Sequence, residues 1–226
     1  KNNIYNIAVC FLHSYLNPIH EIKAEKIIKS INKNIQVSLS SKLIREFREY
    51  ERTSTTCINS YIQETIKNYI DEFILGFKKK GYKKNFFINQ SAGGLLSAKS
   101  AKLKPVTSLM SGPSGGVVST SFFGKIEKFS NLIAFDMGGT STDVCVILEN
   151  TPKLTADSVL EGYPVMVPTL DVHSIGAGGG SIASIDDVGS LVVGPKSAGA
   201  SPGPACYGHG GKVATVTDAN CVLDRV

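Results

Sequence analysis

Two short apolar runs joined by a polar turn constrain the fold of this chain more than any other feature. They lie in NLIAFDMGGTSTDVCVILEN, residues 131–150. Apolar, partly β-branched runs bounded by glycine and aspartate are typical of strands buried in a core. We therefore predict one strand over residues 132–135 and a second over residues 144–148, with a tight turn between them.

The turn between these strands carries more polar groups than a hairpin requires, since a hairpin turn needs only one or two Gly, Asn or Asp residues. Two aspartates flank two glycines and three consecutive hydroxyl residues: Asp136, Gly138, Gly139, Thr140, Ser141, Thr142 and Asp143. Glycines let backbone N–H groups converge on an anion, hydroxyls donate to phosphate oxygens, and a carboxylate at a strand end can hold Mg²⁺. The pattern favours a phosphate-binding turn over a plain polar hairpin.

A second glycine-rich segment, GAGGGS at residues 176–181, is a candidate for close approach to a nucleotide. The chain contains no Gly-Lys-Ser/Thr sequence, which excludes a P-loop. The segment also departs from the dinucleotide fingerprint, because the third glycine would fall on Ser181 and no strand is predicted directly before it. A contact to a base or ribose and a purely structural turn explain its glycines equally well. These glycines are Gly176, Gly178, Gly179 and Gly180.

Asp171 and His173, in the segment LDVHS, are the second candidate group. Residues two apart on a strand share a face, so both side chains can ligate a divalent metal, with Cys206 completing the site from a distant segment. A histidine hydrogen-bonded to an aspartate beside the glycine loop is an equally good interpretation. Asp218, in TVTDAN, is expected to cap the helix that follows rather than to face a cleft.

The first 104 residues are basic and are predicted to be mainly helical. They hold 18 of the 24 Lys and Arg residues but only 8 of the 19 acidic residues. Because no aromatic or arginine platform accompanies the lysines, a solvated surface is favoured over nucleic-acid binding. Helices are expected over residues 19–31, over KLIREFREYER and over residues 57–81, with a strand at QVSLSS. The last helix carries an apolar stripe expected to face the core: Ile58, Tyr61, Ile62, Ile66, Tyr69, Ile70, Phe73, Ile74 and Phe77.

From about residue 86 the chain changes to strands joined by glycine loops. FFINQ is a strand candidate, and SGPSGGVVSTSFFGKI contains a helical run. The five cysteines include no C-x-x-C pair, which favours reduced thiols and a cytoplasmic location over a disulfide framework. No apolar run approaches the ~20 residues of a membrane helix, so no contact with a membrane is expected.

Several longer motifs together resemble the hydantoinase A/5-oxoprolinase family, whose relatives include ATP-dependent acetone and acetophenone carboxylase subunits. The motifs are HSYLNPIHE, YERTSTT, SGPSGGVV, FDMGGTSTDV, LDVHSIGAGGGSIA, VGPKSAGASPGPACYG and TVTDAN, in the family's order. The resemblance implies an α/β fold of actin-like ATPase architecture, in which two ribonuclease-H-like lobes hold ATP between them. In that family FDMGGTSTDV is the phosphate loop of the second lobe.

The resemblance also implies an incomplete enzyme. Residues 1–128 would be the C-terminal part of the first lobe, with a helical segment and the connection between lobes. Residues 129–226 would begin the second lobe. The family carries a similar loop in its first lobe, whereas this chain contains only one Asp-x-Gly-Gly-Thr sequence. Asp224 stands where family members usually have glycine. The isolated chain is therefore expected to be inactive.

The activity implied is ATP-dependent hydrolysis of a cyclic amide of the 5-oxoproline or hydantoin type, as in glutathione metabolism. Asp136 would bind the Mg²⁺ shell, and Asp143 would orient water or metal or act as a base, unless it caps its own turn. The expected partners are the small cyclic amide, the remaining lobes or a partner subunit, and further copies in a homo-oligomer. The alternatives are an ATP-using ketone carboxylase subunit and a non-catalytic nucleotide-binding module.

Overall fold

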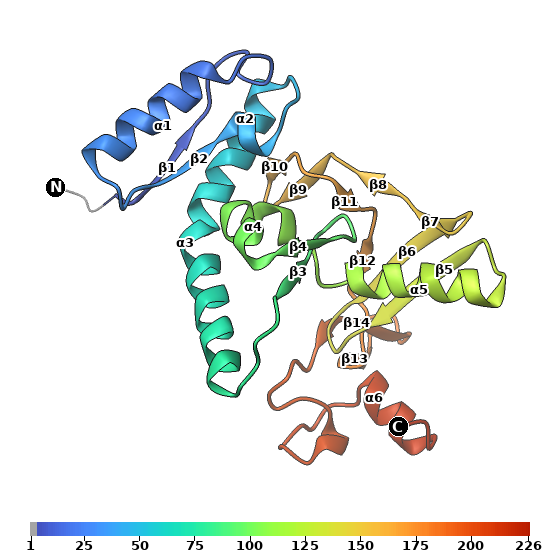
Figure 1. The fold of residues 1–226 in the computed structure, drawn as a ribbon. Coiled ribbons are helices and arrows are strands. Elements are labelled where there is room, and N and C mark those ends of the chain that lie inside the picture. The colour runs from blue at the N-terminus through green and yellow to red at the C-terminus, as the bar shows by residue number, and fades with distance from the viewer. Residues whose placement is uncertain (1–3) are drawn as a thin grey trace. The chain divides into compact units, whose positions relative to one another are not determined.

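The computed structural model describes residues 4–226, which form two compact units of α/β structure (Figure 1). The first unit contains the residues up to Gly115 together with Leu154–Leu170, and the second contains Gly116–Lys153 and Asp171–Val226. The chain thus leaves the first unit before the predicted boundary after residue 128, and it returns to that unit once. Within the described residues no helix is both long and apolar enough to span a membrane.

The first unit begins with a parallel strand pair. β1 (Asn6–Val9) and β2 (Gln36–Leu39) are in register from Asn6 opposite Gln36 to Val9 opposite Leu39, and α1 (Ile19–Ile31) connects them (Figure 1). The predicted helix over residues 19–31 and the predicted strand at QVSLSS are confirmed.

The predicted helix over residues 42–52 is wrong. α2 (Ser40–Leu43) ends after one turn, and α3 (Glu49–Lys79) begins only after Arg48. Arg48 has a φ of +77°, which a right-handed helix cannot accommodate. The stop of α3 is as predicted, because Gly81 has a φ of +87° just beyond the helix end.

A buried ion pair joins the elements on either side of this break. Glu21 and Arg52 are both fully buried, with Arg52 Nη2 3.9 Å from Glu21 Oε1. The Glu21 carboxylate also accepts hydrogen bonds from Ser40 Oγ at 2.6 Å and from the backbone N–H groups of Ser41 at 2.9 Å and Phe11 at 3.0 Å. Burial raises the pKa of Glu21, but these hydrogen bonds outweigh burial, so its pKa lies below the usual value. One carboxylate therefore ties α1, α2 and the loop after β1 to α3.

Glu21→Gln should lower the free energy of unfolding by about 2–3 kcal/mol, because it removes the charged acceptor of three hydrogen bonds and leaves Glu49, 2.8 Å away and partly exposed, as the carboxylate paired with Arg52. The wild-type contribution is present above the unfolded-state pKa of about 4.3 and is lost as the pH falls through the lower folded-state pKa. Urea unfolding at pH 3 to 7 measures both effects. Glu25→Gln, which breaks the more exposed Lys42–Glu25 pair, is the control and should cost less than about 1 kcal/mol. Equal losses would contradict this account.

The buried face of α3 is mostly polar, which corrects the predicted apolar stripe. Of that stripe Ile70 is buried, whereas Tyr61 is 84% exposed and Tyr69 63% exposed. The other buried positions of α3 are Arg52, Thr55, Thr56, Asn59, Ser60 and Gln63. These side chains bind backbone and neighbouring hydroxyls. The amide of Asn59 donates to Ser38 Oγ at 2.9 Å, and Thr55 Oγ1 accepts from the backbone N–H of Met166 at 2.8 Å.

The rest of the first unit consists of short hairpins and one-turn helices. β3 (Phe87–Asn89), the predicted FFINQ strand, pairs with β4 (Leu95–Ser97), and α4 (Ala98–Leu103) and η1 (Pro105–Ser108) follow. The returning segment supplies four short strands: β8 (Leu154–Thr155), β9 (Ser158–Leu160), β10 (Tyr163–Val165) and β11 (Thr169–Leu170). Val106, Val165 and Val167 form the apolar core of this unit.

The second unit is built around the predicted hairpin. β5 (Leu132–Met137) pairs antiparallel with β6 (Thr142–Leu148), which also pairs with β12 (His173–Ile175) and β7 (Thr151–Pro152) (Figure 1). The two strands and the turn predicted from the sequence are therefore confirmed.

Helix α5 (Ser114–Glu127), the predicted helical run, approaches the start of β5 at Gly124. A Cβ at Gly124 would lie 2.2 Å from Leu132 Cδ1 and 3.0 Å from the Phe129 carbonyl oxygen, so glycine fits this close contact best. The unit is completed by the hairpin of β13 (Ser181–Ile185) and β14 (Leu191–Ser197), the short η2 (Ala205–Tyr207) and helix α6 (Val216–Val222).

Candidate functional site

The β5–β6 turn presents its glycines and hydroxyls at the surface. The pairing runs from Leu132 opposite Ile147 to Met137 opposite Thr142, and the N–H of Gly138 donates to the Ser141 carbonyl at 2.9 Å. Gly138, Gly139 and Thr140 are exposed and Ser141 is half-buried. A short closed turn with exposed glycines leaves room for an anion to approach the backbone.

The two carboxylates of the turn lie directly opposite one another, because the register pairs Asp136 with Asp143. Opposed residues on antiparallel strands share a face, and two like charges placed there repel one another. Asp143 is half-buried and accepts a hydrogen bond from Ser174 Oγ on β12, whereas Asp136 is exposed. Asp143 is thus oriented by β12, and the alternative in which it caps its own turn is not observed. A cation at the paired carboxylates would relieve their repulsion.

The three hydroxyl residues divide into two kinds. Thr142 is 3% exposed, and its Oγ1 donates to the carbonyl of Ala177 in the glycine loop. Thr140 and Ser141 lie further out in the turn. Thr142 therefore has a structural contact that the sequence did not predict, and Thr140 and Ser141 are the hydroxyls better placed for a ligand.

The glycine loop packs against the back of the turn through backbone contacts. The N–H of Gly179 donates to the Gly138 carbonyl at 2.9 Å, and the N–H of Gly180 donates to the Gly139 carbonyl at 2.7 Å. A Cβ at Gly178 would lie 2.7 Å from the carbonyl carbon of Gly139. By contrast, the atom nearest to a Cβ at Gly176 is 3.8 Å away. The loop therefore has a structural role against the backbone of the turn, and contact with a base or ribose stays a prediction.

Gly178→Ala should destabilise the second unit by about 1–3 kcal/mol, because the added Cβ meets backbone atoms that cannot rotate away. Gly139→Ala is the matched control in the same pair of loops, since a Cβ there has nothing within 4 Å. Thermal unfolding should therefore show a lower Tm for Gly178→Ala and an almost unchanged Tm for Gly139→Ala. Equal Tm values would mean that the close packing of the two loops is unimportant.

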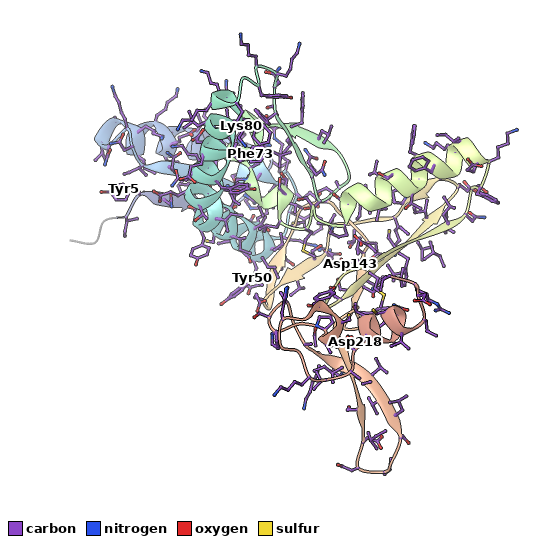
Figure 2. The ribbon with its side chains drawn as sticks, turned by 90° about the horizontal axis from the view of Figure 1, so that it is seen from below. Tyr5, Tyr50, Phe73, Lys80, Asp143 and Asp218 are labelled. Atoms are coloured by element: carbon purple, nitrogen blue, oxygen red, sulfur yellow. The ribbon has the colours of Figure 1, made fainter. Side chains whose placement is uncertain are left out.

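Helix α6 supports the glycine loop from the other side. The backbone N–H and the hydroxyl of Thr217 both donate to the Gly179 carbonyl at 2.8 Å. Thr215 is the N-cap of α6, and Asp218 completes a capping box by accepting from the Thr215 N–H at 2.9 Å. The expectation that Asp218 has a capping role is confirmed, although Asp218 lies in the first turn of the helix (Figure 2).

Asp218 also fixes the segment that contains Cys206. Its Oδ1 accepts from the Cys206 N–H at 2.7 Å, and this bond and those from Thr215 hold the pKa of Asp218 well below its usual range. Partial desolvation and the neighbouring Asp218 carboxylate raise the pKa of the Cys206 thiol to about 11. The thiol is therefore protonated at neutral pH, a state that disfavours metal ligation.

Asp171 and His173 are adjacent, but Asp171 already has a cationic partner. Lys153 Nζ lies 3.0 Å from Asp171 Oδ2, and His173 Nε2 lies 3.5 Å from Asp171 Oδ1. A hydrogen bond from Lys153 lowers the pKa of Asp171, with smaller contributions from the Lys153 and His173 charges. Cys206 does not complete a metal site with this pair, because residues 4–226 contain no cluster of three His, Cys, Asp or Glu side chains suited to a metal. The prediction of a metal at Asp171 and His173 alone remains a prediction.

A surface hollow of about 560 Å³ opens beside the turn. Its lining includes Met137, Gly138 and Gly139 of the turn and Gly179 of the glycine loop. The other lining residues come from later in the chain: Cys206, Tyr207, Thr217, Asn220, Cys221 and Val226. Sequence reasoning did not single out Tyr207 or Asn220, although both lie in motifs of the family resemblance, VGPKSAGASPGPACYG and TVTDAN.

Comparison with known proteins identifies the family. Residues 52–226 match the family model described as hydantoinase/oxoprolinase. The chain belongs to this family. It is 36% identical to caprolactamase subunit alpha of Pseudomonas jessenii, over 99% of this chain and 32% of that protein. It is 40% identical to 5-oxoprolinase 1 of Arabidopsis thaliana, over 97% of this chain and 17% of that protein. The chain thus spans about a third or less of the length of these relatives.

Two solved structures resemble the fold. The crystal structure of the ATP-dependent caprolactamase from Pseudomonas jessenii matches with a TM-score of 0.80 and 37% identity, over 97% of this chain and 32% of that one. The nucleotide-free acetone carboxylase matches with a TM-score of 0.72 and 30% identity, over 98% of this chain and 32% of that one. The predicted α/β class is confirmed. Asp224, which stands where family members usually have glycine, has a φ of +51°, a left-handed backbone conformation that glycine adopts most readily.

Proposed function

We propose that this chain supplies one half of the phosphate-binding site of an ATP-dependent enzyme that hydrolyses a cyclic amide. The observation that carries the proposal is the exposed β5–β6 turn, in which Gly138 and Gly139 are flanked by the opposed carboxylates of Asp136 and Asp143. Relatives named as a 5-oxoprolinase and a caprolactamase act on cyclic amides, and a matching structure is described as ATP-dependent.

Under this proposal the turn binds the phosphates of ATP through backbone N–H groups around Gly139 and through the hydroxyls of Thr140 and Ser141. The hydrogen bonds that Gly179 and Gly180 donate to the carbonyls of Gly138 and Gly139 hold these groups in position before the nucleotide arrives. Enzymes accelerate phosphoryl transfer mainly by positioning the reacting groups and by neutralising their charge. The carbonyl oxygen of the cyclic amide would attack the γ-phosphorus, and ADP would leave. Water would then add to the activated ring carbon, phosphate would leave with the former carbonyl oxygen, and the C–N bond would break as its nitrogen takes up a proton, which opens the ring.

The paired carboxylates fit Mg²⁺, because they offer oxygen ligands on one face of the hairpin with unrelieved negative charge. Bound there, Mg²⁺ would neutralise charge on the transferring phosphate. Asp136, the exposed member, is the candidate for holding the ion through its water shell. Asp143, oriented by Ser174, is the candidate for orienting water or accepting its proton.

We also infer the larger setting from the family. The two units would belong to two lobes of an actin-like ATPase, with ATP between lobes of the complete cytoplasmic protein and with other subunits or copies assembled around it. An ATP-using ketone carboxylase subunit is the second candidate function, because the nucleotide-free acetone carboxylase structure matches nearly the whole chain.

In the full-length enzyme, Asp136→Asn and Thr140→Ala should each lower cyclic-amide-dependent ADP release by about 100-fold, because the first weakens the hold on Mg²⁺ and the second removes a hydrogen bond to the transferring phosphate. The assay measures ADP with 5-oxoproline, caprolactam or acetone as the second substrate. Asp187→Asn and Ser119→Ala change the same chemical groups at exposed positions away from the turn and should leave the rate unchanged. Full activity in both turn variants would rule out the proposal.

Residues 1–226 alone should bind Mg²⁺–ATP with a Kd of about 0.1 mM or weaker. One phosphate turn supplies only part of the contacts, and each charge-assisted hydrogen bond that is lacking costs about 1.5–3 kcal/mol. Isothermal titration calorimetry measures this affinity directly. Nanomolar binding by this chain would show that a second turn is unnecessary.

A further inference from the structure

A basic hollow at the C-terminal end of α3 lies outside the phosphate turn and takes no part in the proposed reaction. It has a volume of about 580 Å³, and its lining includes the exposed lysines Lys78, Lys83, Lys84 and Lys99. Residues 76–104 contain eight lysines and no aspartate or glutamate. Lys102 is paired with Asp71, whereas none of the residues lining the hollow is acidic.

The lining also contains three aromatic side chains, Tyr82, Phe86 and Phe87, which we call the aromatic floor. The rings of Tyr82 and Phe86 have centroids 4.7 Å apart, and both rings contact Phe77 of α3. Phe87 is 58% exposed. The expectation that no aromatic group accompanies the lysines is therefore wrong, because the chain folds back after α3 and brings Phe86 onto Phe73 and Tyr82 onto Phe77.

Backbone hydrogen bonds at the end of α3 fix the segment that forms the hollow. The N–H of Tyr82 donates to the Phe77 carbonyl at 3.1 Å and that of Gly81 to the Lys78 carbonyl at 3.0 Å, which is the Schellman arrangement at the end of a helix. Its characteristic apolar contact is made by the rings of Phe77 and Tyr82, 6.1 Å apart. Lys83 and Lys84 are thus held beside the aromatic floor.

An apolar floor with a rim of one charge is the pattern of a protein-binding surface, in which burial supplies affinity and charge supplies orientation and rate of association. Nucleic acid fits less well. The residues lining the hollow include no arginine, the residue preferred for bidentate contacts to phosphate.

We propose that this hollow docks an acidic segment of a partner protein, with carboxylates against Lys78, Lys83, Lys84 and Lys99 and an apolar side chain on the aromatic floor. The caprolactamase relative is named as a subunit, so that relative works in an assembly. The inference is independent of the phosphate turn and goes beyond the proposed enzymatic role.

The test uses residues 1–226 and a fluorescein-labelled 15-residue peptide in which glutamates alternate with leucine and phenylalanine. Fluorescence anisotropy should show binding that weakens as salt is raised from about 50 to 300 mM. The triple variant Lys78→Glu, Lys83→Glu, Lys84→Glu should weaken binding at least about tenfold. The matched control Lys23→Glu, Lys26→Glu, Lys33→Glu makes the same charge change at exposed positions on and just after α1 and should change affinity less than about twofold.

A second variant tests the aromatic floor separately. Phe87→Ser should weaken peptide binding several-fold while leaving its salt dependence unchanged, because it removes apolar contact and no charge. The proposal is overturned if the peptide does not bind, or if both lysine variants weaken binding equally. It is also overturned if a 15-nucleotide oligo-dT or vesicles containing phosphatidylserine bind more tightly than the peptide.

Discussion

The candidate site depends on two backbone hydrogen bonds between segments about 40 residues apart. Gly179 and Gly180 donate to the carbonyls of Gly138 and Gly139, and these bonds fix the back of the β5–β6 turn. Backbone can approach backbone this closely only where no Cβ intervenes, as the 2.7 Å clash expected at Gly178 shows. α6 then holds the glycine loop through Thr217, so three segments converge on one short turn.

In this arrangement the atoms of the turn that contact the supporting loop differ from those that are exposed to a ligand. The carbonyls of Gly138 and Gly139 and the hydroxyl of Thr142 point into the supporting loop. Asp136 and Thr140 are exposed and form what we call the outer side of the turn, and Asp143, opposite Asp136, is half-buried. Rigid support of a small polar surface reduces the reorganisation needed when a charged ligand binds. The second glycine loop therefore supports the proposed phosphate site through its packing on the turn.

Local patterns predicted the hairpin, the helix over residues 19–31 and the stop of α3, because strand alternation, helix periodicity and glycine act within a few residues. Contacts between distant segments were not predictable in this way. The polar buried face of α3 depends on Arg52 meeting Glu21, 31 positions earlier in the chain, and on Thr55 meeting the backbone of Met166. The register that opposes Asp136 and Asp143 likewise follows from pairing along the whole of β5 and β6.

The central claim is that the outer side of the β5–β6 turn is the phosphate-binding surface. It is tested most directly by amide chemical-shift mapping of ¹⁵N-labelled residues 1–226 titrated with Mg²⁺–ATP. The account predicts saturable shifts at Gly139, Thr140 and Ser141, with smaller shifts at Gly179 behind them. Shifts that leave the turn unchanged and instead gather around Lys83 would contradict it.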